Sequence, residues 1–141
     1  MLMNSGEKAI VDTFFRNRAN IYFGSGTHQF FVGLYRGSVS ESTTLATIPG
    51  EPSGNGYSRQ VINRSAEDWP TLEQNDDLDW MASSVEVYFE AVGGDIGPAD
   101  GYFVCTSADN LGTLIGTVPF KMERTIKAGD RAIIQVQSVI K

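Results

Sequence analysis

Residues 85–91 carry the strictest pattern in the sequence. Apolar side chains alternate there with polar or aromatic ones: Val85, Val87, Phe89 and Ala91 against Glu86, Tyr88 and Glu90. Because successive side chains of a β-strand point to opposite faces of a sheet, the alternation predicts a strand with one buried face. We expect its polar face to be exposed to solvent or to lie at a contact with another chain.

Further short segments with strand character accompany this one and are separated by turn signals. The sequence predicts strands at residues 29–35, 57–64, 101–106, 113–118, 120–126 and 132–140, and the segment QFFVGLY at 29–35 is expected to be central. Turn-forming sequences at Gly93-Gly94 and at residues 127–130 punctuate them. No helix alternates with the strands, so we predict a mainly β fold, an antiparallel β-sandwich of jelly-roll or immunoglobulin-like type.

One α-helix is predicted in front of the strands, at about residues 5–17. Asn4 and Glu7 form a capping pattern, and the following segment places apolar side chains at helical spacing. Ile10 and Phe14 lie one turn apart on the resulting apolar stripe. Since a helix this short is marginal in water by itself, we expect the stripe to pack on the sheet or on a neighbouring subunit.

The length of the chain, 141 residues, fits a single domain over residues 1–141 with one hydrophobic core. Two long loops are predicted within it, at about residues 36–56 and 65–83. Loops of this length are uncommon in a compact domain unless they serve a function. Contact with a partner is one such function.

The charge and the apolar pattern of the chain disfavour two classes of partner. A formal net charge of −6 argues against nucleic acid, because phosphate contacts need clustered Lys and Arg. No apolar stretch approaches the roughly 18 residues that indicate a membrane span, and the N-terminus lacks the apolar region of a signal peptide. We therefore expect a protein made in a cytoplasm, with neither nucleic acid nor membrane as a partner.

Candidates for catalysis are few. His28 is the only histidine, and no nucleophile motif such as G-x-S-x-G accompanies it, so we expect no catalytic residue. Cys105, the only cysteine, lies in an apolar run and is expected to be a buried thiol. Gly54-Asn55-Gly56 precedes a strand rather than a helix, so it should turn the chain and not bind phosphate.

The acidic segment 67–79 is the strongest candidate for a metal site. Oxygen ligands of the kind that Ca²⁺ prefers are clustered in it: Asn75, Asp76, Asp77 and Asp79. The spacing of an EF-hand is absent, so we expect a solvated acidic loop or an interface, and neither metal nor another cofactor. A weak calcium site and a glycosidase-type carboxylate pair are the alternatives. Trp69 and Trp80 flank the segment and are expected to anchor its ends by burial.

Several segments together resemble a group of small structural proteins of tailed bacteriophages. These are the front helix EKAIVDTFFRN, the strand with VGLY, residues 40–46 (SESTTLA), the segment GYSRQ and an A-G-D turn before the last strand. Asn55-Gly56 stands where the group has a Gly pair, and the segment 63–81 is longer and more acidic than in the group. Members are described as virion, head or tail-fibre proteins, so the resemblance implies a place in a virion and does not imply an enzyme.

The resemblance leads to a functional expectation. We expect a non-enzymatic virion structural protein, made in the host cytoplasm, and most concretely a capsid decoration or cement protein that binds the major capsid protein or other virion subunits. We also expect a homo-oligomer, with three-fold symmetry as one arrangement. The first alternative is a tail fibre, adaptor or receptor-binding protein that contacts host glycan, with Trp69 and Trp80 stacking on sugar rings. The second is a small calcium-dependent binding module or hydrolase.

Aromatic and arginine side chains are the best candidates for contacts with other subunits, because a few such anchors dominate most interfaces. Together with the helix stripe, the candidate interface residues are Ile10, Phe14, Tyr35, Tyr57, Arg59, Trp69 and Trp80. The alternative for each is packing within the sandwich. Tyr57 and Arg59 lie two residues apart in a predicted strand and should share one face, which looks either toward the core or toward a neighbour.

Overall fold

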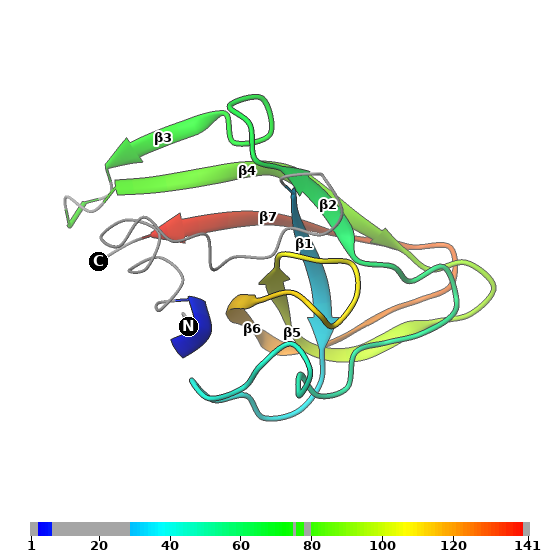
Figure 1. Ribbon diagram of the computed structural model, residues 1–141. Coiled ribbons are helices and arrows are strands. Elements are labelled where there is room, and N and C mark those ends of the chain that lie inside the picture. Colours follow the sequence, from blue (N-terminus) through cyan, green and yellow to red (C-terminus); the bar gives the residue numbers. More distant parts are fainter. Residues whose placement is uncertain (1–2, 7–28, 75, 78–79, 140–141) are drawn as a thin grey trace.

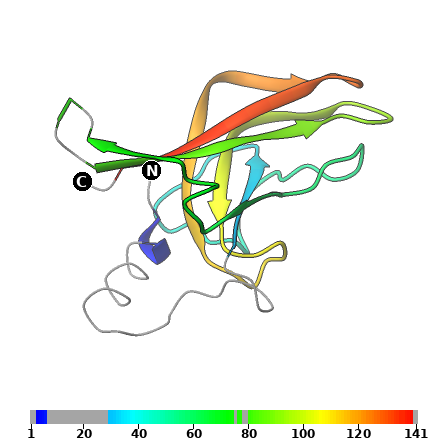
Figure 2. The same ribbon diagram turned by 90° about the horizontal axis from the view of Figure 1, so that it is seen from above.

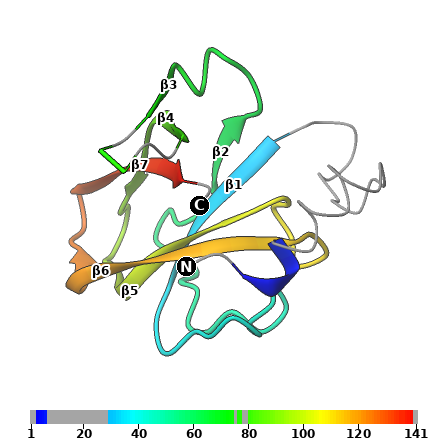
Figure 3. The ribbon, with the colours of Figure 1, turned by 90° about the vertical axis from the view of Figure 1, so that its left-hand side faces the viewer.

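The computed structural model describes residues 3–6, 29–74, 76–77 and 80–139 of the chain. Its strands form two antiparallel sheets that pack face to face (Figure 1, Figure 2, Figure 3). Sheet A has the strand order β2-β1-β5-β6 and consists of β1 Gln29–Tyr35, β2 Gln60–Asn63, β5 Ile96–Cys105 and β6 Leu114–Ile126. Sheet B has the order β3-β4-β7 and consists of β3 Thr71–Gln74, β4 Trp80–Glu90 and β7 Arg131–Val139. The predicted mainly β, antiparallel sandwich is confirmed.

The main hydrophobic core lies between the two sheets. Both contribute buried side chains to it, among them Val32 and Leu34 of β1, Phe89 of β4, Tyr102 of β5 and Val136 of β7. The alternation predicted for residues 85–91 is confirmed, because Val87, Phe89 and Ala91 are buried whereas Glu86, Tyr88 and Glu90 are exposed. Burial of one face of β4 is thus what positions sheet B over sheet A.

A second hydrophobic cluster covers the other face of sheet A. Its buried members come from three strands, the loop after β1 and the N-terminal segment: Tyr35, Leu45, Phe103, Cys105, Leu114 and Met3. β1 therefore meets apolar groups on both faces, which explains why QFFVGLY is apolar almost throughout. β1 lies between β2 and β5, so the expected central position of residues 29–35 is confirmed. Cys105 is buried, as expected.

Several sequence-based boundaries are corrected by the structure. The strand predicted at 101–106 is β5, which begins earlier, at Ile96. β2 begins at Gln60, so the predicted strand 57–64 is shorter at its start. The predicted strands 113–118 and 120–126 form the single strand β6, because Pro119 lies on an edge strand, where a missing N–H breaks no ladder. The predicted loop at about 65–83 contains β3 and the start of β4. β3 is a largely exposed edge strand held by hydrogen bonds to β4, so its sequence TLEQ shows no apolar alternation.

The other long loop and the helix were also predicted from the sequence. Residues 36–59 contain no helix or strand in the structure, as expected for a loop at about 36–56. Residues 4–6 are helical, whereas most of the predicted helix of about 5–17, with Ile10 and Phe14, lies outside the described residues, as does His28. Within the described part of the chain, no helix has the length and apolar character that crossing a membrane requires.

Candidate functional site

The side chain of Arg59 is the centre of a buried polar cluster beside sheet A. Its guanidinium forms a bidentate ion pair with Glu51, from Nε to Oε1 at 2.8 Å and from Nη2 to Oε2 at 2.8 Å. It also donates to oxygens of the β5–β6 loop, namely the carbonyls of Ser107 and Asp109 and the side-chain oxygen of Asn110. The group lies 5.2 Å from the ring centre of Phe103, and 6% of the Arg59 side chain is exposed. These contacts fasten the loop 36–59 to the β5–β6 loop.

Tyr57 joins the same cluster and extends it to β1. Its hydroxyl donates to Oε1 of Glu51 at 2.9 Å and accepts the backbone N–H of Leu34 at 3.0 Å. Its ring stacks on Phe89, with centroids 5.6 Å apart and an interplanar angle of 10°. β2 pairs with β1 only as far as Val32, so Tyr57 supplies an acceptor for an N–H of β1 beyond that pairing.

Burial is the main cause of the shifted pKa values of Tyr57 and Cys105 in this cluster. It raises the pKa of the Tyr57 hydroxyl far above its usual value, with the nearby Glu51 carboxylate as a further cause. It raises the pKa of the Cys105 thiol to about 11. For Arg59 burial acts to lower the pKa, but the hydrogen bond with Glu51 and other neighbouring groups outweigh it, so the pKa is raised. Tyr57 and Cys105 are therefore neutral and Arg59 is charged near neutral pH, an arrangement suited to holding loops together.

A tight turn at residues 54–56 directs the chain toward this cluster. Gly54, Asn55 and Gly56 have φ angles of 76°, 54° and 81°, so all three occupy the left-handed region that glycine and asparagine tolerate best. The predicted turn at Gly54-Asn55-Gly56 is confirmed. The side chain of Asn55 also donates to the carbonyl of Asp95 at 2.8 Å, which ties the turn to the β4–β5 loop.

Tyr57 and Arg59 thus point into the domain, as the alternative of internal packing predicts. Tyr35 is 3% exposed and belongs to the outer cluster of sheet A. Trp80 pairs with Gln74 at the start of β4, and its side chain lies outside the described residues. A contact between these residues and a partner stays a prediction. The sequence did not identify Glu51, since no local pattern links it to Arg59 eight residues later.

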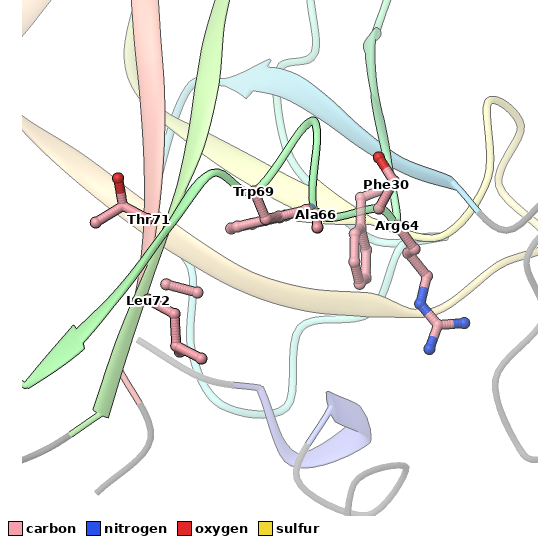
Figure 4. Close-up of a pocket in the computed structure, with 8 residues that line it drawn as sticks. Phe30, Arg64, Ala66, Trp69, Thr71 and Leu72 are labelled. Carbon is pink, nitrogen blue, oxygen red and sulfur yellow. The ribbon is translucent and has the colours of Figure 1, made fainter.

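Trp69 lines an open apolar pocket of about 470 Å³ beside β3 (Figure 4). The pocket, called the β3 pocket below, is lined by Phe30, Arg64, Ser65, Ala66, Trp69, Thr71, Leu72 and Ala82. Trp69 is half-buried and meets Phe30 edge to face, with ring centroids 5.9 Å apart. Leu72 is 70% exposed. Sequence reasoning missed Leu72, because one leucine in a polar segment produces no periodic signal.

The acidic segment next to this pocket was the candidate for a calcium site. Asp76 and Asp77 lie in the turn after β3, whereas Asn75 and Asp79 lie outside the described residues. Across the ranges that the structure describes, no three His, Cys, Asp or Glu side chains are grouped so that they could hold a metal ion. Within the segment, Asp68 has a structural role, since its carboxylate accepts the backbone N–H of Asn63 at 2.7 Å.

A second exposed surface lies on β6 and combines one apolar side chain with two cationic ones. Residues 120–123 of β6 lie opposite the single residue Asp100 of β5, which makes an irregular β-bulge in this edge strand. Phe120 packs toward Tyr102 in the core, and the guanidinium of Arg124 lies 5.6 Å from the ring centre of Phe120. Met122 is 75% exposed. We call Lys121, Met122 and Arg124 the β6 knob; the sequence placed them in a strand without marking them as a surface.

Comparison with known proteins identifies the family. A search of curated proteins finds no match to this chain. Residues 2–140 match the model of a family described as podophage GP4 fiber I protein gp80. The match extends over nearly the whole chain and does not single out the VGLY or GYSRQ segments. The chain therefore belongs to this family of podophage fibre proteins, and it is a structural protein of bacteriophage virions.

Proposed function

We propose that this protein is a component of the fibres of a tailed phage and that it acts by binding other virion chains, without catalysis. The observation that carries the proposal is the family match over residues 2–140, whose description names a fibre protein. A fibre component corresponds to the first alternative that the sequence left open. It replaces the capsid decoration protein as our leading expectation.

The geometry of the described residues supports a binding role. The apolar β3 pocket and the β6 knob with its exposed Met122 are open on the domain, whereas the charged groups of Arg59 and Glu51 are paired with each other. Single exposed apolar side chains such as Leu111 are common on soluble proteins, whereas an open apolar pocket marks a contact with another molecule. Leu72 and Met122 are therefore better anchors for a partner than the buried Tyr35, Tyr57 and Arg59.

Locating the protein on the particle tests the proposal. We would image purified virions by cryo-EM with antibody fragments raised against the folded chain. Bound fragments along the fibres are the expected result. Fragments distributed over the capsid surface would show a decoration protein instead and would contradict the proposed function.

A further inference from the structure

The charges of this chain are strongly segregated along the sequence. Residues 65–120 contain 11 Asp and Glu but no Lys, Arg or His. The next 11 residues, 121–131, contain four of the 11 Lys and Arg of the whole chain. The segment 65–77 contributes Ser65, Ala66, Trp69, Thr71 and Leu72 to the β3 pocket, whereas the basic segment begins with the β6 knob. Arg64 also lines the pocket, and Glu123 and Asp130 lie in the basic segment, but the net charge is negative over residues 64–77 and positive over residues 121–131.

The shapes of the two surfaces are also opposite. The β6 knob is carried by a bulge on an edge strand, and its exposed methionine is flexible and unbranched. The β3 pocket is open and lined mainly by the apolar groups of Phe30, Trp69 and Leu72. Glu67 and Glu73, both exposed, lie in the segment that forms its rim. Lys121 and Arg124 of the knob complement those carboxylates, and Glu123, which lies between Met122 and Arg124 in the sequence, forms an ion pair with Arg36 at 3.6 Å.

We propose that a second copy of this chain binds head to tail: Met122 of one copy enters the β3 pocket of the next, and Lys121 and Arg124 face the carboxylates of residues 65–77. Opposite charge steers the two surfaces together and sets their orientation, while burial of the methionine and of Leu72 supplies affinity. A second copy is favoured as the occupant because both complementary surfaces belong to the same chain.

The arrangement of the fold makes this contact intermolecular. β3 lies at one end of the domain and the hairpin between β6 and β7 lies at the other, in both Figure 1 and Figure 2. A copy cannot fill its own pocket across that distance. Because the contact joins two different surfaces, it is heterologous, and successive copies form a closed ring or a filament according to the rotation between them.

The test begins with the mass of the purified full chain in solution, measured by sedimentation velocity over a range of concentrations. We expect the wild type to form oligomers. Met122→Glu places a carboxylate on the knob, and Leu72→Arg places a cation in the pocket, so each variant should weaken association at least about tenfold. Leu111→Glu is the matched control, since Leu111 is 77% exposed but belongs to neither surface, and it should keep the wild-type mass.

Mixing the two variants gives the sharpest result. Met122→Glu keeps its pocket and Leu72→Arg keeps its knob, so an equimolar mixture should contain heterodimers and no larger species. Both changes are at exposed positions, and thermal unfolding followed by circular dichroism should match the wild type.

Three results would overturn the proposal: a monomeric wild type at all concentrations, an unchanged mass of Met122→Glu, or a mixture that stays monomeric. The fibre assignment is tested separately. If the purified wild type is monomeric but antibody fragments bind along the fibres of virions, the protein is still a fibre component, and the two surfaces would contact another virion protein.

Discussion

Arg59 illustrates how much of this domain depends on single side chains outside the strands. Its guanidinium is paired with one carboxylate and hydrogen-bonded to three groups of a distant loop. Burying a charged group costs free energy unless it is paired and hydrogen-bonded, and these contacts with Glu51 and the β5–β6 loop meet that requirement for Arg59. Glu51 is therefore as important to the loop as Arg59.

Glu51→Gln tests this pairing. The change leaves the buried guanidinium without its counter-charge and should lower the free energy of unfolding by about 3 kcal/mol, measured by urea denaturation. Glu86→Gln is the control, because Glu86 is exposed on β4 and lies outside the cluster, and it should change that free energy by less than about 0.5 kcal/mol. Equal stabilities of the two variants would show that the ion pair contributes nothing.

Ser84 has a comparable role inside sheet B. Ser84 and Val85 of β4 lie opposite the single residue Val136 of β7, which is a β-bulge. The Ser84 hydroxyl accepts the backbone N–H of Val136 at 3.0 Å and donates to the carbonyl of Val85 at 2.8 Å. A side chain thus provides the hydrogen bond that the interrupted ladder lacks.

Ser84→Ala removes that acceptor and leaves the buried N–H of Val136 unpaired. We expect a loss of about 1–3 kcal/mol in the free energy of unfolding, measured by thermal or chemical denaturation. Ser53→Ala, in an exposed part of the loop 36–59, makes the same chemical change and should be nearly neutral. A neutral Ser84→Ala would mean that another group takes over the hydrogen bond.

At the scale of elements, close packing of β1 against β5 explains the glycine in VGLY. Gly33 pairs with Phe103, and a Cβ atom on Gly33 would lie within 2.9 Å of three atoms of the Phe103 ring. Phe103 is fully buried, so its ring has little room to move.

Gly33→Ala should therefore destabilise the domain by about 1–3 kcal/mol, even though replacing glycine in a strand usually helps. Val61→Ile is the control, since it also adds one carbon to sheet A but at an exposed position of β2. Urea denaturation of both variants gives the comparison. An unchanged or raised stability of Gly33→Ala would contradict the packing argument.

The loops at one end of the sandwich are joined by Asp95. Its carboxylate accepts the backbone N–H of Ala128 at 2.9 Å and the ammonium of Lys127 at 3.2 Å. The pKa of Asp95 is lowered by these two hydrogen bonds, that of Ala128 first. Because the folded-state pKa is depressed, the contribution to stability is present above the unfolded-state pKa and is lost as the pH falls through the folded-state value.

Asp95→Asn should consequently lower the melting temperature at about pH 6, and the difference from the wild type should shrink below about pH 3. Differential scanning calorimetry at both pH values measures it. Glu90→Gln, which removes an exposed carboxylate of β4, is the matched control and should not reproduce the pattern. A difference that grows in acid would contradict the assignment.

At the scale of the whole molecule, the sandwich leaves edge strands β3 and β6 at the surfaces that we assign to contacts between copies. Exposed edge strands are sites where other chains can bind, and charged side chains on them restrict which chains do so. Both edges carry exposed charges here, acidic in β3 and mostly basic at the end of β6. The charge pattern therefore serves selectivity as well as solubility.

The predicted N-terminal helix adds one further expectation at this scale. Ile10→Asp or Phe14→Asp places a charge on the apolar stripe and should impair folding or assembly, because that charge must be desolvated when the stripe packs. Arg16→Asp, on the opposite side of the same predicted helix, is the control and should be tolerated. Yield of folded protein and incorporation into virions are the measurements. Normal assembly of both stripe variants would count against docking of the helix.

Local patterns were sufficient for much of this fold. Alternation identified residues 85–91 and 29–35 as strands, and glycine and asparagine identified the turn at 54–56, because strand faces and left-handed turns depend on neighbouring residues. Where such signals are weak the prediction was wrong, as in β3, whose stability comes from backbone pairing with β4.

Pairings between distant residues could not be obtained in this way. Glu51 and Arg59 meet in a loop without periodicity, and Met122 and Leu72 become exposed surfaces only because of where β6 and β3 lie at the edges of their sheets. The apolar character of each side chain is known from the sequence and indicates which residues will be buried. Ion pairs, bulges and pockets depend instead on distances between residues far apart in the sequence. The strands could therefore be predicted from the sequence, whereas the surfaces available to a partner could be identified only from the three-dimensional structure.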